Sequence, residues 1–288
     1  MSIKTISPHV SEPTLDTTAW QQTAREFLRF YQIAPSAGGP LDLIYSVLQA
    51  FSNLPYENLS KIIKSRDFHD DVARLRMPDE VWEDFRRHHL GGTCFSLTFL
   101  LKAILDHLKF QTYPVMARMR SGDNRHCALV VELGGKHYLL DPGYVLELPL
   151  EIDPSRATSL RSAHGGVELV PNERPLHFEL YTFKNNTRQW RYEFADAPVT
   201  AAEFFMHWIG SFQWNGMNAI CLSQATRDSL LYFRQDYFRQ TNAATKRSWK
   251  IKQDREKIIQ QNFGVAPEIV EAAQAVIDER RQDGSRDG

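Results

Sequence analysis

The chain has 288 residues, 42% of them hydrophobic, and a formal net charge of -1 at pH 7. This length accommodates two or three subdomains with a substantial core, and the near-neutral charge gives no general attraction to nucleic acid or to an anionic membrane surface. Three cysteines in a chain of this length do not indicate a disulfide framework, so we expect reduced thiols. No apolar stretch is typical of a signal core or a membrane span, and we therefore expect a cytoplasmic protein.

The first part of the chain is predicted to be helical. After an N-terminal tail at residues 1–16, residues 17–110 carry apolar side chains at helical spacing, as between Leu43 and Phe51. The Pro- and Gly-rich residues 35–40 separate the first two predicted helices.

The rest of the chain changes from β-rich to mixed. Short β runs dominate residues 111–199, which include a hairpin turn at Asn185-Asn186 and a predicted crossover loop at residues 151–173. Residues 200–281 are mixed and end in a polar helix, and residues 282–288 are expected to form a disordered tail.

A tight hairpin is predicted where two β-rich runs flank a Gly-Gly dipeptide. In the register of a two-residue loop, Leu133 pairs with Lys136, and His126 and Asp141 become diagonal neighbours on one face. Such neighbours lie roughly 7–8 Å apart at the backbone, which lets an imidazole reach a carboxylate. Pro142 ends the ladder, so we expect Asp141 at the end of its strand.

Cys94 has the position of a cysteine nucleophile. It follows Gly91-Gly92, where the backbone can turn tightly, and it begins an apolar stretch of helical length. At a helix N-terminus the macrodipole and the unpaired N–H groups favour the thiolate, which is the attacking species. A buried structural cysteine would fit this stretch equally well.

Taken together, Cys94, His126 and Asp141 form a candidate catalytic triad. An imidazole oriented by a carboxylate beside a thiol generates a reactive thiolate–imidazolium pair. Each residue alone is more often structural, His126 as a core histidine and Asp141 as a turn residue. The shared register of the His–Asp pair favours catalysis.

Several segments resemble those of the arylamine N-acetyltransferases, from about residue 25 to about residue 270. That family carries Pro-Phe-Glu-Asn-Leu, Arg-Gly-Gly-x-Cys-Phe-Glu, a strand His, Asp-Val-Gly-Phe-Gly and, near the C-terminus, Phe-Gly-Ile. The corresponding segments here are Pro55-Tyr56-Glu57-Asn58-Leu59, Gly91-Gly92-Thr93-Cys94-Phe95, His126, Leu140-Asp141-Pro142-Gly143-Tyr144 and, more weakly, Asn262-Phe263-Gly264-Val265.

This resemblance implies an α+β fold with a cysteine-protease-like Cys-His-Asp core. A helical bundle at residues 17–110 would carry the nucleophile, followed by an antiparallel β-barrel at 111–199 and an α/β lid at 200–281. Cys94 would be acylated, His126 would activate it, and Asp141 would orient His126. Residues that would contact the substrates are Phe95, Gly143 and Tyr144.

The implied reaction is a ping-pong acyl transfer from acetyl-CoA, or another acyl-CoA, to an arylamine, a hydrazine or a similar amine. We expect these small molecules as partners, with neither nucleic acid nor a membrane, and no metal. His88-His89, with His69 or His107, lacks the usual spacing of metal ligands.

Departures from the family pattern surround the triad without touching it. Leu90 stands where the family has Arg, and Ser96 stands where it has Glu. Glu57 is retained and is expected to find a cationic partner among Arg86, Arg87, His88 and His89. Val145 replaces a Gly in the loop that borders the substrate pocket, which leaves the identities of the donor and the acceptor open.

Other functions fit parts of the pattern. An amide synthase of the same fold would take its acyl group from a carrier protein, and a transglutaminase-like or peptidase-like thiol enzyme shares the Cys-His-Asp order. A non-catalytic homologue serving as a binding module would account for the departures, but the intact triad argues against it.

Overall fold

Helices dominate the first third of the chain. The computed structural model describes residues 14–34, 38–68, 70–144, 146–162, 164–184 and 187–286. The helices of this part are α1 (Gln21–Phe30), α2 (Pro40–Phe51), α3 (Leu59–Asp67), α4 (Pro78–His88) and α5 (Cys94–His107). Helices α2 and α4 each begin with a proline, which is tolerated there because the first N–H groups have no partner within the helix. The predicted separation of the first two helices is confirmed, although Pro35 lies outside the described residues.

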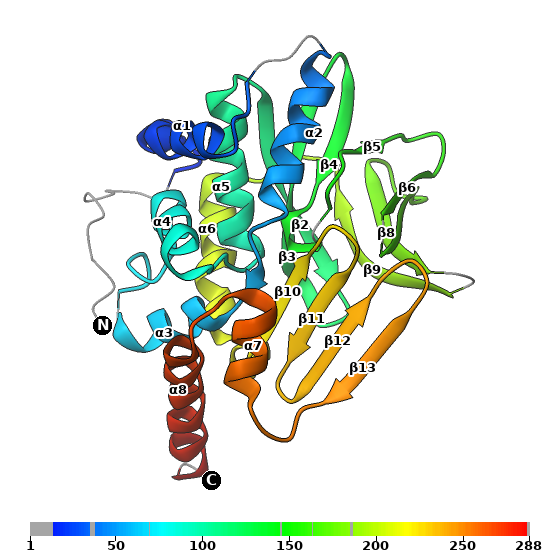
Figure 1. Cartoon of the computed structure of the whole chain (residues 1–288). Helices are drawn as coiled ribbons and strands as arrows, with labels where there is room; N and C mark the ends of the chain where they lie inside the picture. The colour runs from blue at the N-terminus through cyan, green and yellow to red at the C-terminus, as the bar shows by residue number, and fades with distance from the viewer. Residues whose placement is uncertain are drawn as a thin grey trace.

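Helix α5 occupies the centre of the molecule (Figure 1). Its residues from Cys94 to Leu105 are all buried. The helix packs against α1 and α4 on one side and against strands β2 (Gln111–Met119) and β3 (Gly122–Leu133) on the other. A helix that is buried all round needs an apolar composition on every face, which accounts for the continuous apolar run in the sequence. Cys94 is therefore the first residue of a rigid, fully packed helix.

Eight antiparallel strands form a nearly closed sheet in the order β5-β4-β3-β2-β9-β8-β7-β6. Its remaining strands are β4 (Lys136–Leu140), β5 (Leu150–Ile152), β6 (Thr158–Ser162), β7 (Gly165–Pro171), β8 (His177–Lys184) and β9 (Thr187–Ala195). The predicted hairpin register is confirmed, because Leu133 pairs with Lys136 and Leu129 with Leu140. The hairpin turn expected at Asn185-Asn186 lies outside the described residues.

The prediction of a crossover loop at residues 151–173 is wrong. Strands β6 and β7 pair with each other there, Thr158 with Leu169 and Leu160 with Val167. The apolar residues of this segment are few, but Leu160, Val167 and Leu169 contact the core of the eight-stranded sheet. A strand needs only alternate apolar positions, so the polar composition of the segment concealed two strands.

A second sheet joins distant parts of the chain in the order β1-β10-β11-β12-β13. Strand β1 (Tyr56–Glu57) comes from the helical part, and the others follow the eight-stranded sheet: β10 (Cys221–Ala225), β11 (Leu230–Arg234), β12 (Tyr237–Thr241) and β13 (Lys246–Lys250). Figure 1 shows this sheet alongside the eight-stranded sheet. The segment expected to be a lid thus shares a sheet with the residues that resemble the Pro-Phe-Glu-Asn-Leu motif.

Three further helices complete the last third of the chain: α6 (Ala201–Gly210), α7 (Arg255–Phe263) and α8 (Pro267–Arg286). Aromatic residues of α6 pack on α5, with Phe204 5.4 Å from Phe95 between ring centroids. Helix α8 continues past residue 281 to Arg286, into the segment expected to be disordered.

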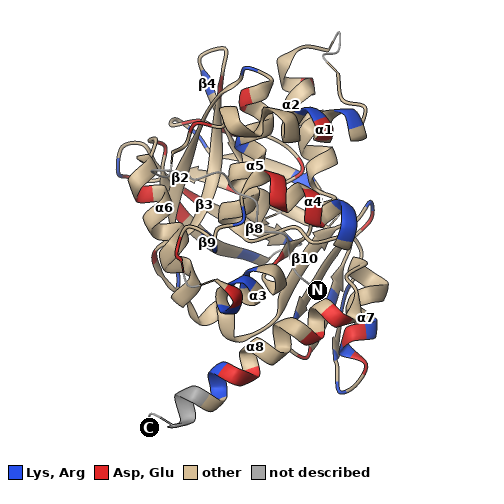
Figure 2. Cartoon of the chain, turned by 90° about the vertical axis from the view of Figure 1, so that its left-hand side faces the viewer, with Lys and Arg blue, Asp and Glu red and all other residues tan. Residues whose placement is uncertain are grey.

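Charges of both signs are intermixed on the helical side of the molecule, over α1, α4, α7 and α8 (Figure 2). Within the described ranges, no helix is long and apolar enough to cross a membrane.

Candidate active site

Cys94 lies at the first position of α5, with 5% of its surface exposed to a cavity. Thr93 precedes it in an extended conformation and makes no capping hydrogen bond with its side chain. The first N–H groups of a helix have no partner within the helix, so this end of α5 presents free donors and the positive end of its dipole. Both features stabilise negative charge on sulfur.

The turn before the nucleophile is fixed by the segment that contains β1. Gly92 accepts a hydrogen bond from the Glu57 N–H at 2.9 Å and donates one to the Pro55 carbonyl at 3.3 Å. A Cβ on Gly91 would lie 1.9 Å from the Pro55 oxygen, so only glycine allows this close approach. The left-handed residue of the turn is His89, with φ 55°, rather than either glycine. The glycine pair is therefore required for packing, not for its conformational freedom.

His126 and Asp141 meet as predicted. His126 lies on β3, Asp141 follows the last residue of β4, and the His126 Nε2 to Asp141 Oδ2 distance is 2.8 Å. Both side chains are buried. Because Nε2 is bound to the carboxylate, Nδ1 is the ring nitrogen left for the hydrogen bond between His126 and Cys94. The structure thus brings the three predicted catalytic side chains together.

Gly143, which the sequence predicts as a substrate-binding residue, lies against Cys94 and His126. It lies in the short helical turn from Pro142 to Tyr144 that directly follows Asp141. A Cβ at this position would lie 2.8 Å from His126 Cε1 and 3.1 Å from Cys94 Cβ. Glycine is therefore needed here because any side chain would press between the thiol and the imidazole.

Two tyrosines surround the His–Asp pair. The ring of Tyr144, which the sequence predicts as a binding residue, stands edge-on to His126 with centroids 5.2 Å apart. Tyr192, which sequence reasoning missed, donates a hydrogen bond of 2.5 Å to Asp141 Oδ2. Asp141 also accepts the Tyr144 N–H at 3.0 Å. Tyr192 comes from the distant strand β9, and no local motif marks it.

The electrostatics of the site favour a charged pair. A hydrogen bond from the Cys127 thiol, together with the hydrogen bond and charge of His126, outweighs burial and holds the pKa of the Cys94 thiol well below its usual value. Burial opposes the imidazolium, but the charge and hydrogen bond of Asp141 raise the pKa of His126 to about 10. Both shifts favour a thiolate beside an imidazolium.

A lysine adds to this field from helix α3. Lys61 is buried, its ammonium lies 4.6 Å from the centre of the Phe212 ring, and it donates a hydrogen bond to Ser211. Burial lowers the pKa of Lys61 to about 8, and its charge contributes to lowering the pKa of Cys94.

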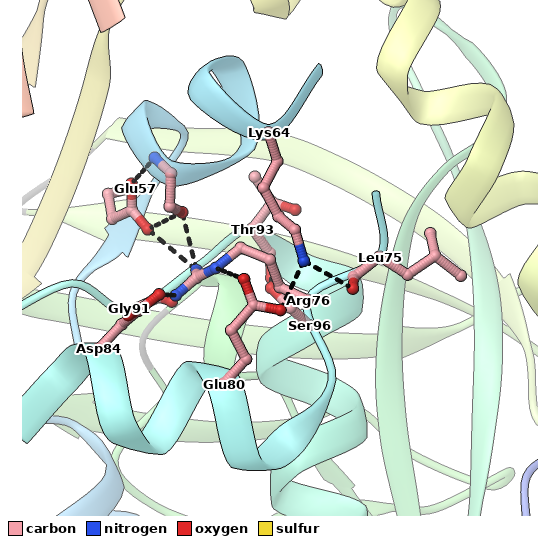
Figure 3. A network of polar contacts seen from close by, with 10 residues as sticks. Glu57, Lys64, Leu75, Arg76, Glu80, Asp84, Gly91, Thr93 and Ser96 are labelled. Carbon is pink, nitrogen blue, oxygen red and sulfur yellow. Dashed lines mark hydrogen bonds and ion pairs between the residues drawn. The ribbon is translucent and has the colours of Figure 1, made fainter. Parts of the chain in front are cut away.

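The cation that Glu57 requires is Arg76, and none of the four residues proposed from the sequence supplies it. Arg76 is 3% exposed and lies 3.4 Å from Glu57 between Nη1 and Oε1. Its guanidinium also donates to Asp84 at 2.7 Å and to the Gly91 carbonyl at 2.5 Å (Figure 3). Arg76 thus connects the acidic residues directly to the turn before Cys94. It was missed because it lies in the connection between α3 and α4, far from the motif in sequence.

The two departures next to the nucleophile are accommodated without charge. Leu90 is buried in the hydrophobic cluster that also holds Phe95. Ser96 donates a hydrogen bond of 3.1 Å to the Thr93 carbonyl within the first turn of α5. Val145, the third departure, lies outside the described residues.

A cavity of about 950 Å³ opens beside the triad, lined by residues of both sheets and of the first turn of α5. All three predicted binding residues, Phe95, Gly143 and Tyr144, border it, although the Phe95 ring is fully buried and stacks on Trp208 of α6. The lining includes eight Lys and Arg side chains and one carboxylate, that of Glu147. Among the described residues, which do not include His69, no group of His, Cys, Asp and Glu side chains is placed to hold a metal ion.

Comparison with known proteins identifies the family. An N-acetyltransferase family model matches residues 41–271, most of the chain. The search of curated proteins gives no match.

Several solved structures share the fold. The arylamine N-acetyltransferase from Mycobacterium abscessus aligns with a TM-score of 0.77 at 14% identity, covering 95% of this chain and 99% of its own. The enzyme from Mycobacterium marinum aligns with a TM-score of 0.73 at 15% identity, covering 89% and 98%. The enzyme from Salmonella typhimurium gives 0.71 at 17% identity, covering 88% and 98%. At these identities the likeness shows the cysteine-protease-like fold, and the family itself is shown by the model that matches residues 41–271. The chain therefore belongs to the arylamine N-acetyltransferase family of acyltransferases.

Proposed function

We propose that the protein transfers an acyl group from acetyl-CoA, or another acyl-CoA, to an arylamine, a hydrazine or a similar weakly basic amine. The observation that carries this proposal is the Cys94–His126–Asp141 arrangement, whose first two members line the cavity of about 950 Å³. A cavity of this size is at the upper end of the range for small-molecule sites. Both substrates are small molecules, and we place the reaction in the cytoplasm, where thiols stay reduced.

In the first half-reaction, the Cys94 thiolate attacks the thioester carbonyl of the donor. The negative charge that develops on the carbonyl oxygen would be stabilised by the N–H groups of Cys94 and Phe95 at the start of α5. The tetrahedral intermediate then expels the CoA thiolate, which takes a proton from the His126 imidazolium, and the acyl group remains on sulfur.

In the second half-reaction, the amine attacks the acyl-Cys94 carbonyl. His126, now neutral, accepts the proton that the amine loses, and the Cys94 thiolate leaves. The hydrogen bond to Asp141 keeps the imidazole in the orientation and tautomer that both steps need. The product is an amide, and the thiolate–imidazolium pair is regenerated.

The charge of the cavity supports a phosphorylated donor. Among the residues that line it, basic side chains outnumber carboxylates eight to one, whereas the helical side of the molecule has intermixed charge. A ligand with several phosphates is the chemistry that such a lining attracts.

Initial rates measured while donor and amine concentrations are both varied test the proposal. Parallel double-reciprocal lines are expected, because CoA leaves before the amine reacts. Cys94→Ala should release no CoA, whereas Cys221→Ala should retain turnover. Cys221 is a matched control because it lines the same cavity but burial raises the pKa of its thiol to about 11. Intersecting lines, or turnover by Cys94→Ala, would refute the acyl-enzyme scheme.

A further inference from the structure

Arg191 occupies a β-bulge next to the triad. Leu180 of β8 pairs with Tyr192, and Tyr181 pairs with Trp190, so Arg191 is the extra residue on β9. A bulge changes the direction in which a side chain points and is often found beside an active site. Arg191 lines the catalytic cavity, and the next residue, Tyr192, holds Asp141.

Arg239 lines the same cavity from the other sheet. It lies on β12, with its guanidinium 4.7 Å from the centre of the Tyr232 ring. Its Nε is buried and has no hydrogen-bond partner among the described residues. A guanidinium nitrogen that is buried without an acceptor is costly unless a ligand completes its hydrogen bonds.

Arg191 and Arg239 line the same cavity, and each carries a positive charge. Burial and the positive charges of Arg239 and Arg120 lower the pKa of Arg191, while the Tyr144 phenol acts in the opposite direction. Arg191 Nε donates to a neutral acceptor, Thr182 Oγ1, at 2.6 Å. The cavity wall therefore carries like charges from both sheets.

Across the residues that the structure describes, neither Arg191 nor Arg239 forms an ion pair with a carboxylate. Nearby arginines do: Arg118 and Arg174 both contact Glu193, and Arg188 lies 2.7 Å from Glu168. The other arginines that line the cavity, Arg125, Arg161 and Arg234, also form no such ion pair among the described residues, but of these five only Arg239 has a buried nitrogen without a hydrogen-bond partner. Guanidinium groups without a counter-ion match the planar oxygens of a carboxylate or a phosphate.

We propose that Arg191 and Arg239 form a binding site for an oxyanion group of a substrate. The group is either a carboxylate on the amine acceptor or a phosphate of the donor. The site shares its cavity with the triad, because Tyr144, which contacts His126, lines the same cavity as both arginines, and Arg191 directly precedes Tyr192, which donates to Asp141. The proposal rests on the proposed function, because it assigns these residues to selection of a substrate in the same cavity.

Paired substrates, one with and one without an anionic group, test this site. The donors are acetyl-CoA and the S-acetyl thioester of N-acetylcysteamine, which has no phosphate. The acceptors are 4-aminobenzoate and aniline. Each pair is compared by the ratio of kcat/KM values in the wild type and in Arg191→Met, Arg239→Met and Arg188→Met. The last is a matched control from the same strand, outside the cavity and paired with Glu168.

Both cavity variants should change one ratio by about tenfold to a hundredfold, the effect expected for a lost charge-assisted hydrogen bond. A fall in the donor ratio identifies a phosphate site, and a fall in the acceptor ratio identifies a carboxylate site. Arg188→Met should leave both ratios unchanged. Ratios within about twofold of the wild type in both cavity variants would overturn the proposal.

Two further measurements keep the test independent of folding and of turnover. If a Met variant fails to fold, Arg191→Gln or Arg239→Gln replaces it, with circular dichroism as the check. If the wild type forms no acyl-enzyme, the proposed function fails, and CoA and 4-aminobenzoate are titrated into the wild type and the variants by calorimetry. Tenfold weaker binding of one ligand to the cavity variants supports the oxyanion site, whereas equal or absent binding refutes it.

Discussion

Replacing Arg76 by methionine should destabilise the protein strongly. The guanidinium is buried among Glu57, Asp84 and the Gly91 carbonyl, so its removal leaves a carboxylate with 0% exposure, that of Glu57, without its cation. Breaking a buried ion pair by removing one partner costs about 3–5 kcal/mol. For a chain of this size each kcal/mol lowers Tm by roughly 2–4 °C, so a decrease of roughly 10 °C is expected.

Urea unfolding followed by circular dichroism measures this cost. Arg87→Met is the matched control, because Arg87 pairs with Glu83 at 2.5 Å but is 61% exposed, and an exposed pair contributes only about 0–1 kcal/mol. The double variant Arg76→Met/Glu57→Gln should lose less than the sum of the single losses, since the unpaired charge is removed as well. A loss below about 1 kcal/mol for Arg76→Met would refute the role assigned to the network.

Other predictions concern the triad. Asp141→Asn should lower kcat/KM by about 10³-fold to 10⁴-fold, measured as CoA release, because the imidazole loses its orienting carboxylate; a change below tenfold would contradict this role. Gly143→Ala should lower kcat at least tenfold while the protein stays folded, because the new Cβ would lie 2.8 Å from His126 Cε1. Gly210→Ala is the control and should leave kcat unchanged, because nothing lies within 4 Å of a Cβ at that position. The alkylation rate of Cys94 by iodoacetamide should stay nearly constant from neutral pH until the pH approaches the His126 pKa of about 10, where the imidazolium is lost. In His126→Asn the rate should instead rise with pH, because the thiol has lost the imidazolium that stabilises its negative charge, and the same profile in the wild type would rule out the ion pair.

The sign of a further pH effect follows from the raised pKa of His126. Its folded pKa of about 10 exceeds the ordinary value of 6.5, so its contribution to stability is fully present below pH 6.5 and is lost as the pH rises through 10. Unfolding by urea at pH 7 and pH 9, compared with His126→Asn, measures this contribution.

The hairpin and the triad could be predicted because the information is local. A two-residue turn fixes the register of β3 and β4, and the register alone places His126 near Asp141. The nucleophile could be found in the same way, since the glycine pair, the thiol and the apolar helix are contiguous in the chain.

The remaining features depend on contacts between distant segments. Tyr192 reaches Asp141 from β9, and Arg76 reaches Glu57 from a connection with no recognisable motif. Strands β6 and β7 were missed because only alternate positions need to be apolar, and the few that are apolar pack on the core of the eight-stranded sheet. The bulge at Arg191 is likewise a property of strand pairing that one strand alone does not reveal.

Mass spectrometry after incubation with acetyl-CoA, without any amine, tests the central claim most directly. One acetyl group should appear on the tryptic peptide that contains Cys94 and should disappear when an arylamine is added. Cys127 and Cys221 should remain unmodified, because burial raises the pKa of both thiols. A Cys94 that reacts rapidly with iodoacetamide but is never acetylated would contradict acyl-CoA as the donor, and an unreactive Cys94 would contradict the triad itself.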